Sequence, residues 1–176
     1  PALKIGQAVF TSHWDNEDEL KAYIKTSRQA AQVLSVQLSD EAIDTICAAF
    51  PEDFEVQFQG ALQILYRNSD LCAEKASALL AKAPKNPCLY ALQALANQAE
   101  PEIATEAMEK ALEIWPDEPD WHAIAGALYE QQERYDLAAQ HLEEALRIQP
   151  KQAHYWQMLG DIKVLEKDYH AARDYF

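Results

Sequence analysis

The sequence predicts an all-α protein, a right-handed α-solenoid of stacked helical hairpins, and three observations lead to this fold class. Only four of 176 residues are glycine and thirty are alanine, which favours helices. No stretch alternates polar and apolar residues as a strand does. Six residues also return 34 positions later, a period typical of repeat proteins: Ala104, Ala111, Pro116, Gly126, Tyr135 and Ala138 as Ala138, Ala145, Pro150, Gly160, Tyr169 and Ala172.

Residues 1–52 lack this recurrence, and we expect them to form an atypical helical cap on the repeats. Asn16 precedes three acids and can cap a helix, with Glu19 placed for a capping box. Residues 1–14 suit a further short helix or a packed arm. Apolar residues then recur at helical spacing in two stretches, before and after Ser39: Leu20, Ile24, Ala31 and Leu34, then Ile43, Ile46, Cys47 and Phe50. Such a hairpin could cover the exposed end of a stack.

Two irregular units are predicted next, at residues 53–84 and 85–118. Pro84 precedes Ala94 by ten residues, as the prolines of the later units precede glycines. Ala94 and Ala104 are ten residues apart, where the later units have twelve, which predicts a two-residue deletion in the turn near Pro101. In residues 53–84, Gly60 and Cys72 are twelve residues apart, as in the later units. The alternative for this stretch is an unrelated helical hairpin.

The units at 119–152 and 153–176 carry the clearest motif. The last reads Trp156, Leu159, Gly160, Tyr169 and Ala172 at spacings W-x-x-L-G, then Y, then A. This motif resembles the tetratricopeptide repeat, a helix-turn-helix of about 34 residues. The resemblance implies short side chains where paired helices cross. The structural positions that it assigns are Ala94, Gly126, Tyr129, Tyr135, Ala138, Ala145, Pro150, Trp156, Leu159, Gly160, Tyr169, Ala172 and Phe176.

The last unit is incomplete, because the positions that close the other units would fall beyond Phe176. A repeat stack needs a polar end. We expect Leu159, Ala172 and Phe176 to be incompletely covered in the sequence as given. The natural protein is therefore expected to continue past Phe176, and the given segment to fray at this end or to cover it by self-association.

Charge is distributed unevenly along the chain, whose formal net charge is −14. Residues 100–149 hold thirteen acids and three bases, a net of −10. Such a region repels phosphate backbones and anionic lipid and attracts basic partners, so we expect no nucleic acid and no membrane as partner. The alternative is that the charge serves solubility alone.

Motifs of catalysis, metal binding and targeting are missing from the sequence. It contains no G-x-S-x-G, no phosphate loop and no H-E-x-x-H. Cys47, Cys72 and Cys88 occur singly, and Cys72 takes a place that alanine fills elsewhere. We predict no enzymatic activity, no metal and no cofactor. Without an apolar run of about 18 residues or a signal peptide, we expect a cytoplasmic protein, unless the chain is a fragment.

The family resemblance implies a concave groove, lined by the first helix of each unit, that accepts a segment of a partner. We expect a protein-protein interaction module or scaffold whose largely apolar groove, with an acidic rim, binds a peptide such as a basic amphipathic helix. The alternative is a structural or self-associating segment that positions another domain. The groove positions that the resemblance assigns are Cys88, Ala91, Leu92, Leu95, Asp120, Ala123, Ile124, Ala127, Glu130, Gln131, His154, Gln157, Met158 and Asp161, continued upstream by Phe54, Gln57, Phe58, Ala61 and Ile64.

Overall fold

The computed structural model describes residues 38–49, 51 and 54–175, and the chain divides into two compact units, Pro1–Val56 and Gln57–Phe176. The expected helix after Asn16 and the side chain of Phe50 lie outside the described residues. The predicted helix after Ser39 is confirmed as α3 (Asp40–Ala49). The Ala42 amide donates to Ser39 Oγ over 3.3 Å, and Ile43, Ile46 and Cys47 are buried on one stripe.

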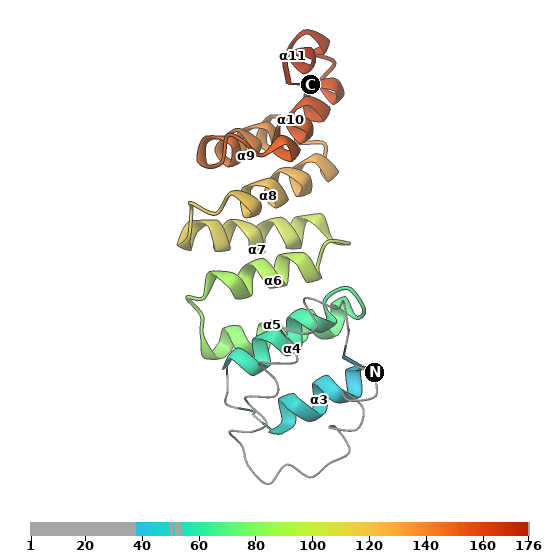
Figure 1. Ribbon diagram of the computed structural model, residues 1–176, viewed down its shortest axis with the longest axis vertical. Helices are drawn as coiled ribbons and strands as arrows, with labels where there is room; N and C mark the ends of the chain where they lie inside the picture. Colours follow the sequence, from blue (N-terminus) through green and yellow to red (C-terminus); the bar gives the residue numbers. More distant parts are fainter. Residues whose placement is uncertain (1–37, 50, 52–53, 176) are drawn as a thin grey trace. The chain divides into compact units, whose positions relative to one another are not determined.

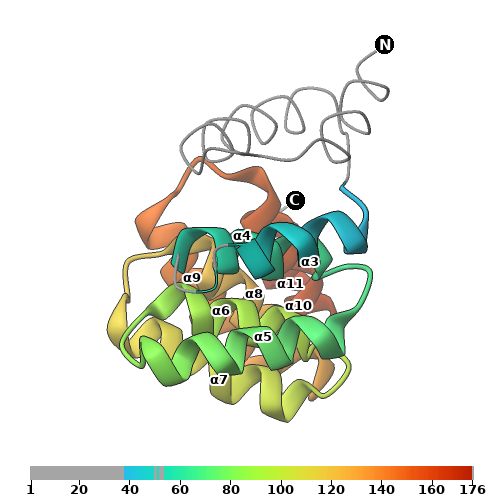
Figure 2. The ribbon, with the colours of Figure 1, turned by 90° about the horizontal axis from the view of Figure 1, so that it is seen from below.

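The second unit is a succession of antiparallel helices (Figure 1). Each consecutive pair from α5 to α11 is in contact, and Figure 2 views them along the direction of stacking. The described residues outside helices form turns and short connections, and none of them is in a strand. The prediction of an all-α solenoid is therefore confirmed. Its helices are the greater part of α4 (Phe54–Ile64), whose first residues belong to the first unit, and then α5 (Ser69–Lys82), α6 (Pro87–Ala96), α7 (Pro101–Ile114), α8 (Pro119–Gln131), α9 (Tyr135–Ile148), α10 (Ala153–Leu165) and α11 (Tyr169–Tyr175).

Helix starts follow from proline and asparagine. Asn68 and Asn86 precede α5 and α6, and their side chains accept hydrogen bonds of 3.0 Å from backbone amides inside the helix. Proline opens α6, α7 and α8, where its fixed φ suits the first turn and its missing amide hydrogen is not needed.

The turns within the last two units share one helix-ending geometry. Glu133 and Lys167, at the same position of successive units, have φ of 58° and 63°, in the left-handed region. After α8 the Glu133 amide donates to the Glu130 carbonyl and the Arg134 amide to the Tyr129 carbonyl. The same two bonds recur after α10, and together they form a Schellman motif. Glycine usually takes the left-handed position, so sequence reading missed both turns.

The short unit differs from its neighbours at the end of its first helix. Helix α6 has ten residues, whereas α8 and α10 have thirteen. Asn97 ends α6, and its side-chain amide donates to the Gln93 carbonyl over 2.7 Å. Pro101 is already the first residue of α7. The two missing residues were expected in the turn near Pro101, but the loss falls on the last turn of α6.

Small residues at the predicted positions bring the paired helices together. Ala94, Ala104, Ala138 and Ala145 are fully buried. At Gly126 an added Cβ would lie 3.0 Å from Leu142 Cγ and 3.3 Å from the Ala138 carbonyl oxygen. Such distances are too short for ordinary packing, so only glycine lets α8 and α9 cross this closely.

A ring donor at one repeat position holds each first helix to the proline before it. The side-chain N or O atom of an aromatic residue lies 2.9 to 3.1 Å from the carbonyl oxygen of the proline six residues earlier in three units, at Tyr90, His122 and Trp156. Trp156 is 38% exposed. Its position in the motif therefore serves this hydrogen bond and a stack on Tyr175, at 5.8 Å between ring centroids, rather than deep burial.

One other structural position, Tyr169, is more exposed than repeat symmetry predicts. Tyr169 is 65% exposed, whereas its counterpart Tyr135 packs against the core. Pro150 is also exposed, as befits a loop. Leu159 and Ala172 are buried, so the expectation that they would be left open is wrong. Phe176 lies outside the described residues.

Candidate functional site

Five of the predicted groove positions are buried and unavailable to a partner, among them Ala91 at 5% exposure. Leu92 is 2% exposed and Ala123 is 7% exposed, because each packs among neighbouring helices. Upstream, Ala61 and Ile64 are equally covered, at 0% and 1%. At these positions the residues of the first helices belong to the core, and the expectation of an open groove there is wrong. The side chain of Phe54 lies outside the described residues.

The remaining groove positions leave a surface on α6, α8 and α10. Apolar Leu95, Ile124, Ala127 and Met158 are partly buried. Ile124 and Met158 recur at the repeat spacing and thus occupy the same place in successive units. Polar residues surround them on the same helices, and Glu130 is partly buried while the others are exposed: Glu130, Gln131, His154, Gln157 and Asp161. The surface is therefore a mixture of small apolar patches and polar groups.

Asp120 joins two of these helices at their starts. Its carboxylate accepts a short hydrogen bond from the hydroxyl of Tyr155, which is 1% exposed. Burial first, and the bond to Asp120 second, raise the pKa of Tyr155 above its ordinary range, so the phenol stays neutral and remains a donor. The bond ties α8 to α10 and sets the spacing of the surface that they share.

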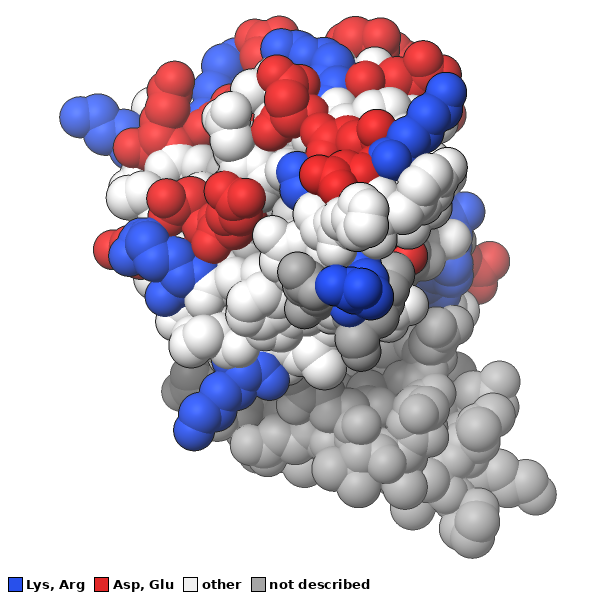
Figure 3. Space-filling model, turned by 90° about the horizontal axis from the view of Figure 1, so that it is seen from above, with Lys and Arg blue, Asp and Glu red and all other residues white. Residues whose placement is uncertain are grey.

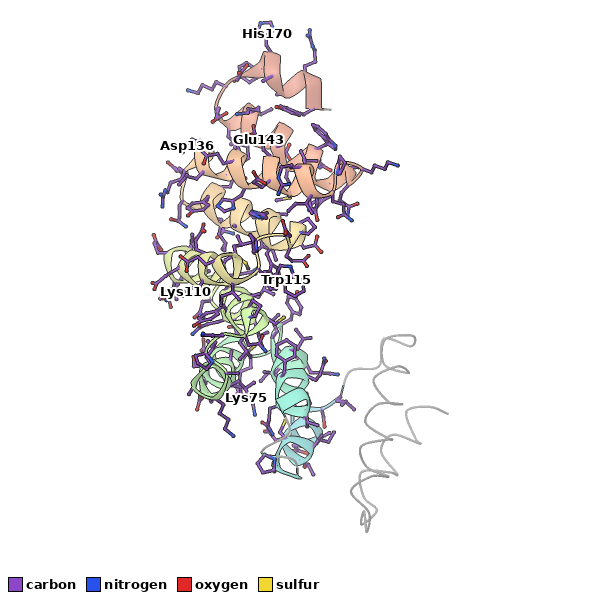
Figure 4. All side chains as sticks on the ribbon, turned by 90° about the vertical axis from the view of Figure 1, so that its left-hand side faces the viewer. Lys75, Lys110, Trp115, Asp136, Glu143 and His170 are labelled. Atoms are coloured by element: carbon purple, nitrogen blue, oxygen red, sulfur yellow. The ribbon has the colours of Figure 1, made fainter. Side chains whose placement is uncertain are left out.

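A hollow that sequence reading did not identify lies beside Trp115. It has a volume of about 660 Å³ and is formed by the connection between α5 and α6 together with this indole, which is 49% exposed. Trp115 meets Trp121 edge to face, with ring centroids 6.0 Å apart. Figure 4 shows Trp115 on the opposite side of α7 from Lys110. The lining residues are Ala83, Pro84, Lys85, Asn86, Pro87, Cys88 and Trp115.

A polar cluster of two histidines, a glutamate and a tyrosine links α7, α8 and α9. Nδ1 of His122 lies 3.1 Å from Nδ1 of His141, and Nε2 of His141 lies 3.1 Å from a carboxylate oxygen of Glu109. The Tyr129 hydroxyl donates to the same carboxylate over 2.9 Å. The bond from His141, more than that from Tyr129, holds the pKa of Glu109 below its ordinary value. The two histidines lie nineteen residues apart on different helices, so no spacing in the sequence links them.

The three bases of residues 100–149 offset only a few of the thirteen acids of this region. Lys110 pairs with Glu106 at 2.7 Å, and Arg147 pairs with Glu144 at 2.5 Å. The third, Arg134, lies over a tyrosine ring. On the face in Figure 3, carboxylates gather over one part of the surface, with Lys and Arg among them. A surplus of negative charge therefore remains for a partner to meet.

Metal and thiol chemistry have few candidate groups in the part of the chain that the structure describes. Within it, no three His, Cys, Asp or Glu side chains come together as a metal site. Burial raises the pKa of the Cys72 thiol to about 11, which leaves it protonated and unreactive. None of the described helices is both long enough and apolar enough to cross a bilayer.

Comparisons with known proteins agree with this geometry. Residues 95–162 match the family model described as tetratricopeptide repeat. No curated protein matches the sequence. Among solved structures, MamA from Desulfovibrio magneticus RS-1 superposes with a TM-score of 0.77 at 17% identity, over 90% of this chain and 92% of that one. PilF of Pseudomonas aeruginosa superposes with a TM-score of 0.63 at 25% identity, over 72% of this chain and 60% of that one.

Proposed function

Because this chain is a tetratricopeptide repeat protein, matched over residues 95–162, we propose that it binds a segment of a partner protein along α6, α8 and α10. Helical repeats present extended surfaces of this kind, in which each unit contributes equivalent positions. The observation that carries the proposal is the pair Ile124 and Met158. They recur at the repeat spacing, are partly accessible, and are flanked by Glu130 and Asp161.

The partner that fits this surface is a basic amphipathic helix. Apolar anchors of such a helix can contact Ile124, Ala127 and Met158, while Lys or Arg side chains on either side meet the acidic groups. Charge of opposite sign speeds encounter and fixes orientation more than it adds affinity. Binding should therefore weaken as salt rises.

The test measures the affinity of two double variants for a probe peptide, a basic amphipathic helix with leucine at positions i, i+3, i+4 and i+7 and lysine between them. Changing Ile124 and Met158 to Glu places two charges in the surface and should reduce affinity at least tenfold. Changing exposed Ile103 and Gln140 to Glu adds the same charge on second helices and should leave affinity within about twofold. Binding that survives the first double change would place the surface elsewhere.

Self-association is a second candidate, favoured by exposed apolar residues at α10 and α11. Val164, Leu165 and Tyr169 are 41%, 43% and 65% exposed and follow one another closely in the chain. Exposed apolar groups that lie together mark interaction surfaces. Sedimentation over a hundredfold range of concentration tests this role, and a strict monomer that keeps its affinity for the peptide would exclude it.

A further inference from the structure

The histidine cluster has a proton requirement that follows from its hydrogen bonds. Nε2 of His122 faces the carbonyl oxygen of Pro116 at 2.9 Å, and Nε2 of His141 faces the Glu109 carboxylate at 3.1 Å. A carbonyl and a carboxylate only accept, so both Nε2 atoms must carry hydrogen. One more hydrogen must lie between the two Nδ1 atoms, which are 3.1 Å apart.

Counting these hydrogens defines the charge of the pair. Two neutral imidazoles carry two N–H hydrogens, whereas the complete chain from Pro116 to Glu109 needs three. The chain is therefore complete only when His122 and His141 together hold one added proton. With none, one of the three contacts lacks its hydrogen. With two, a pair of N–H groups face each other between the rings.

We propose that His122 and His141 share a single proton, and that this proton makes the repeat at residues 119–152 a pH-sensitive joint between α7, α8 and α9. His122 lies on α8, His141 on α9 and Glu109 on α7, so each helix supplies one member. The His141 side chain is 17% exposed and its ring stacks on Tyr129 at 5.4 Å, which limits competition from water.

Charged groups around the pair favour one positive charge. Glu109 accepts directly from His141, and Glu144 on α9 also interacts electrostatically with both rings. Two guanidinium groups disfavour a positive charge on the histidine pair. Arg147 is paired with Glu144 at 2.5 Å and lies 3.8 Å from Asp117, and Arg134 lies 4.9 Å from the centre of the neighbouring tyrosine ring. Carboxylates thus offset one of these cations, and Glu109 keeps its hydrogen bond to the pair.

The sign of the pH effect follows from proton binding. The hydrogen bonds of the folded pair are complete with one added proton, whereas the unfolded chain has no such requirement. The contribution of the pair to stability is therefore lost as the pH rises and the shared proton leaves, and also at low pH, where the unfolded chain binds a second proton that the folded pair excludes. One proton corresponds to a change of up to tenfold in the unfolding constant for each pH unit. Because α8 also carries Ile124 and Ala127, loss of the proton loosens the proposed binding surface.

The chain itself supplies the matched variant for a test. Trp156 shows that an indole at this repeat position donates to the proline carbonyl, so His122→Trp keeps that bond and removes Nδ1. His170→Gln, at an exposed position of α11, is the control. Urea unfolding from pH 6.5 to 8 should show a rise in the unfolding constant of up to tenfold per pH unit in the native protein and the control, and a clearly smaller rise in His122→Trp.

Nitrogen-15 NMR of the native protein gives a readout that does not depend on any variant. At pH 6.5 the two rings should show three protonated nitrogens and one bare one. Two neutral rings, with two bare nitrogens, would overturn the proposal even if His122→Trp failed to fold. Equal pH slopes for the native protein and a folded His122→Trp would overturn it as well.

Discussion

The crossing of α8 and α9 allows a quantitative test of the packing at Gly126. In Gly126→Ala the new Cβ lies 3.0 Å from Leu142 Cγ, whereas carbon atoms prefer about 3.5 to 4.0 Å. The helices or the leucine must give way by a few tenths of an ångström, and such overpacking costs about 1 to 3 kcal/mol. Alanine also gains about 0.8 to 1.0 kcal/mol of helix propensity over glycine. We expect a net loss of about 1 kcal/mol.

A double-mutant cycle separates the clash from the propensity. Leu142→Ala removes both leucine atoms nearest to the new Cβ, and alone should cost about 2 to 5 kcal/mol because Leu142 is fully buried. In that background Gly126→Ala should be neutral or stabilising, so the two changes should couple by about 1 to 2 kcal/mol.

Urea unfolding of the native protein, the two single variants and the double variant measures this coupling. In thermal unfolding, the melting temperature should fall by about 2 to 4 °C for each kcal/mol of lost stability. A stabilising Gly126→Ala in the native background would refute the reasoning, since it would mean that the site has room for a methyl group. Additive effects of the two changes, as independent sites show, would mean that Leu142 is not the obstacle.

Two further predictions concern the turns and the buried thiol. Replacing Glu133 or Lys167 by Gly should raise the free energy of unfolding by about 0.5 to 1 kcal/mol in urea titrations, because a left-handed conformation costs an L-residue about 1 to 2 kcal/mol, part of which the entropy of glycine offsets; a loss of stability would contradict the turn geometry. Cys72, whose pKa is raised to about 11, should react with iodoacetamide at pH 8 far more slowly than partly exposed Cys88, as mass spectrometry can follow, and its contribution to stability should be lost as pH rises from about 8.5 through about 11; equal rates would contradict its burial.

The sequence alone determined the repeat and its phase. Ala104, Ala138 and Gly126 recur as small residues because each must fit where two helices cross, and steric exclusion leaves a glycine or an alanine at these places in each unit. Proline and asparagine likewise mark helix starts by local chemistry. Constraints of this kind act within one repeat, so the spacing of the recurring residues was enough to identify them.

Only the tertiary structure decided which predicted surface residues are accessible. Leu92 and Ala123 occupy groove positions in the sequence pattern but are buried, since exposure depends on how closely neighbouring helices pack. The domain boundaries and the partner-binding role of the remaining positions stay predictions. The early end of α6 also departs from the expected turn, because deleted residues can be absorbed anywhere that capping is satisfied.

The polar cluster shows the same division between local pattern and tertiary contact. His122 lies at the position of a packing tryptophan, and His141 lies in the middle of an acidic helix. Neither has another residue at a sequence spacing that would indicate a contact. The stacking of α7, α8 and α9 brings them within hydrogen-bonding distance of each other and of Glu109. Hydrogen bonds between helices depend on the approach of backbones far apart in the chain, which no single-repeat pattern encodes.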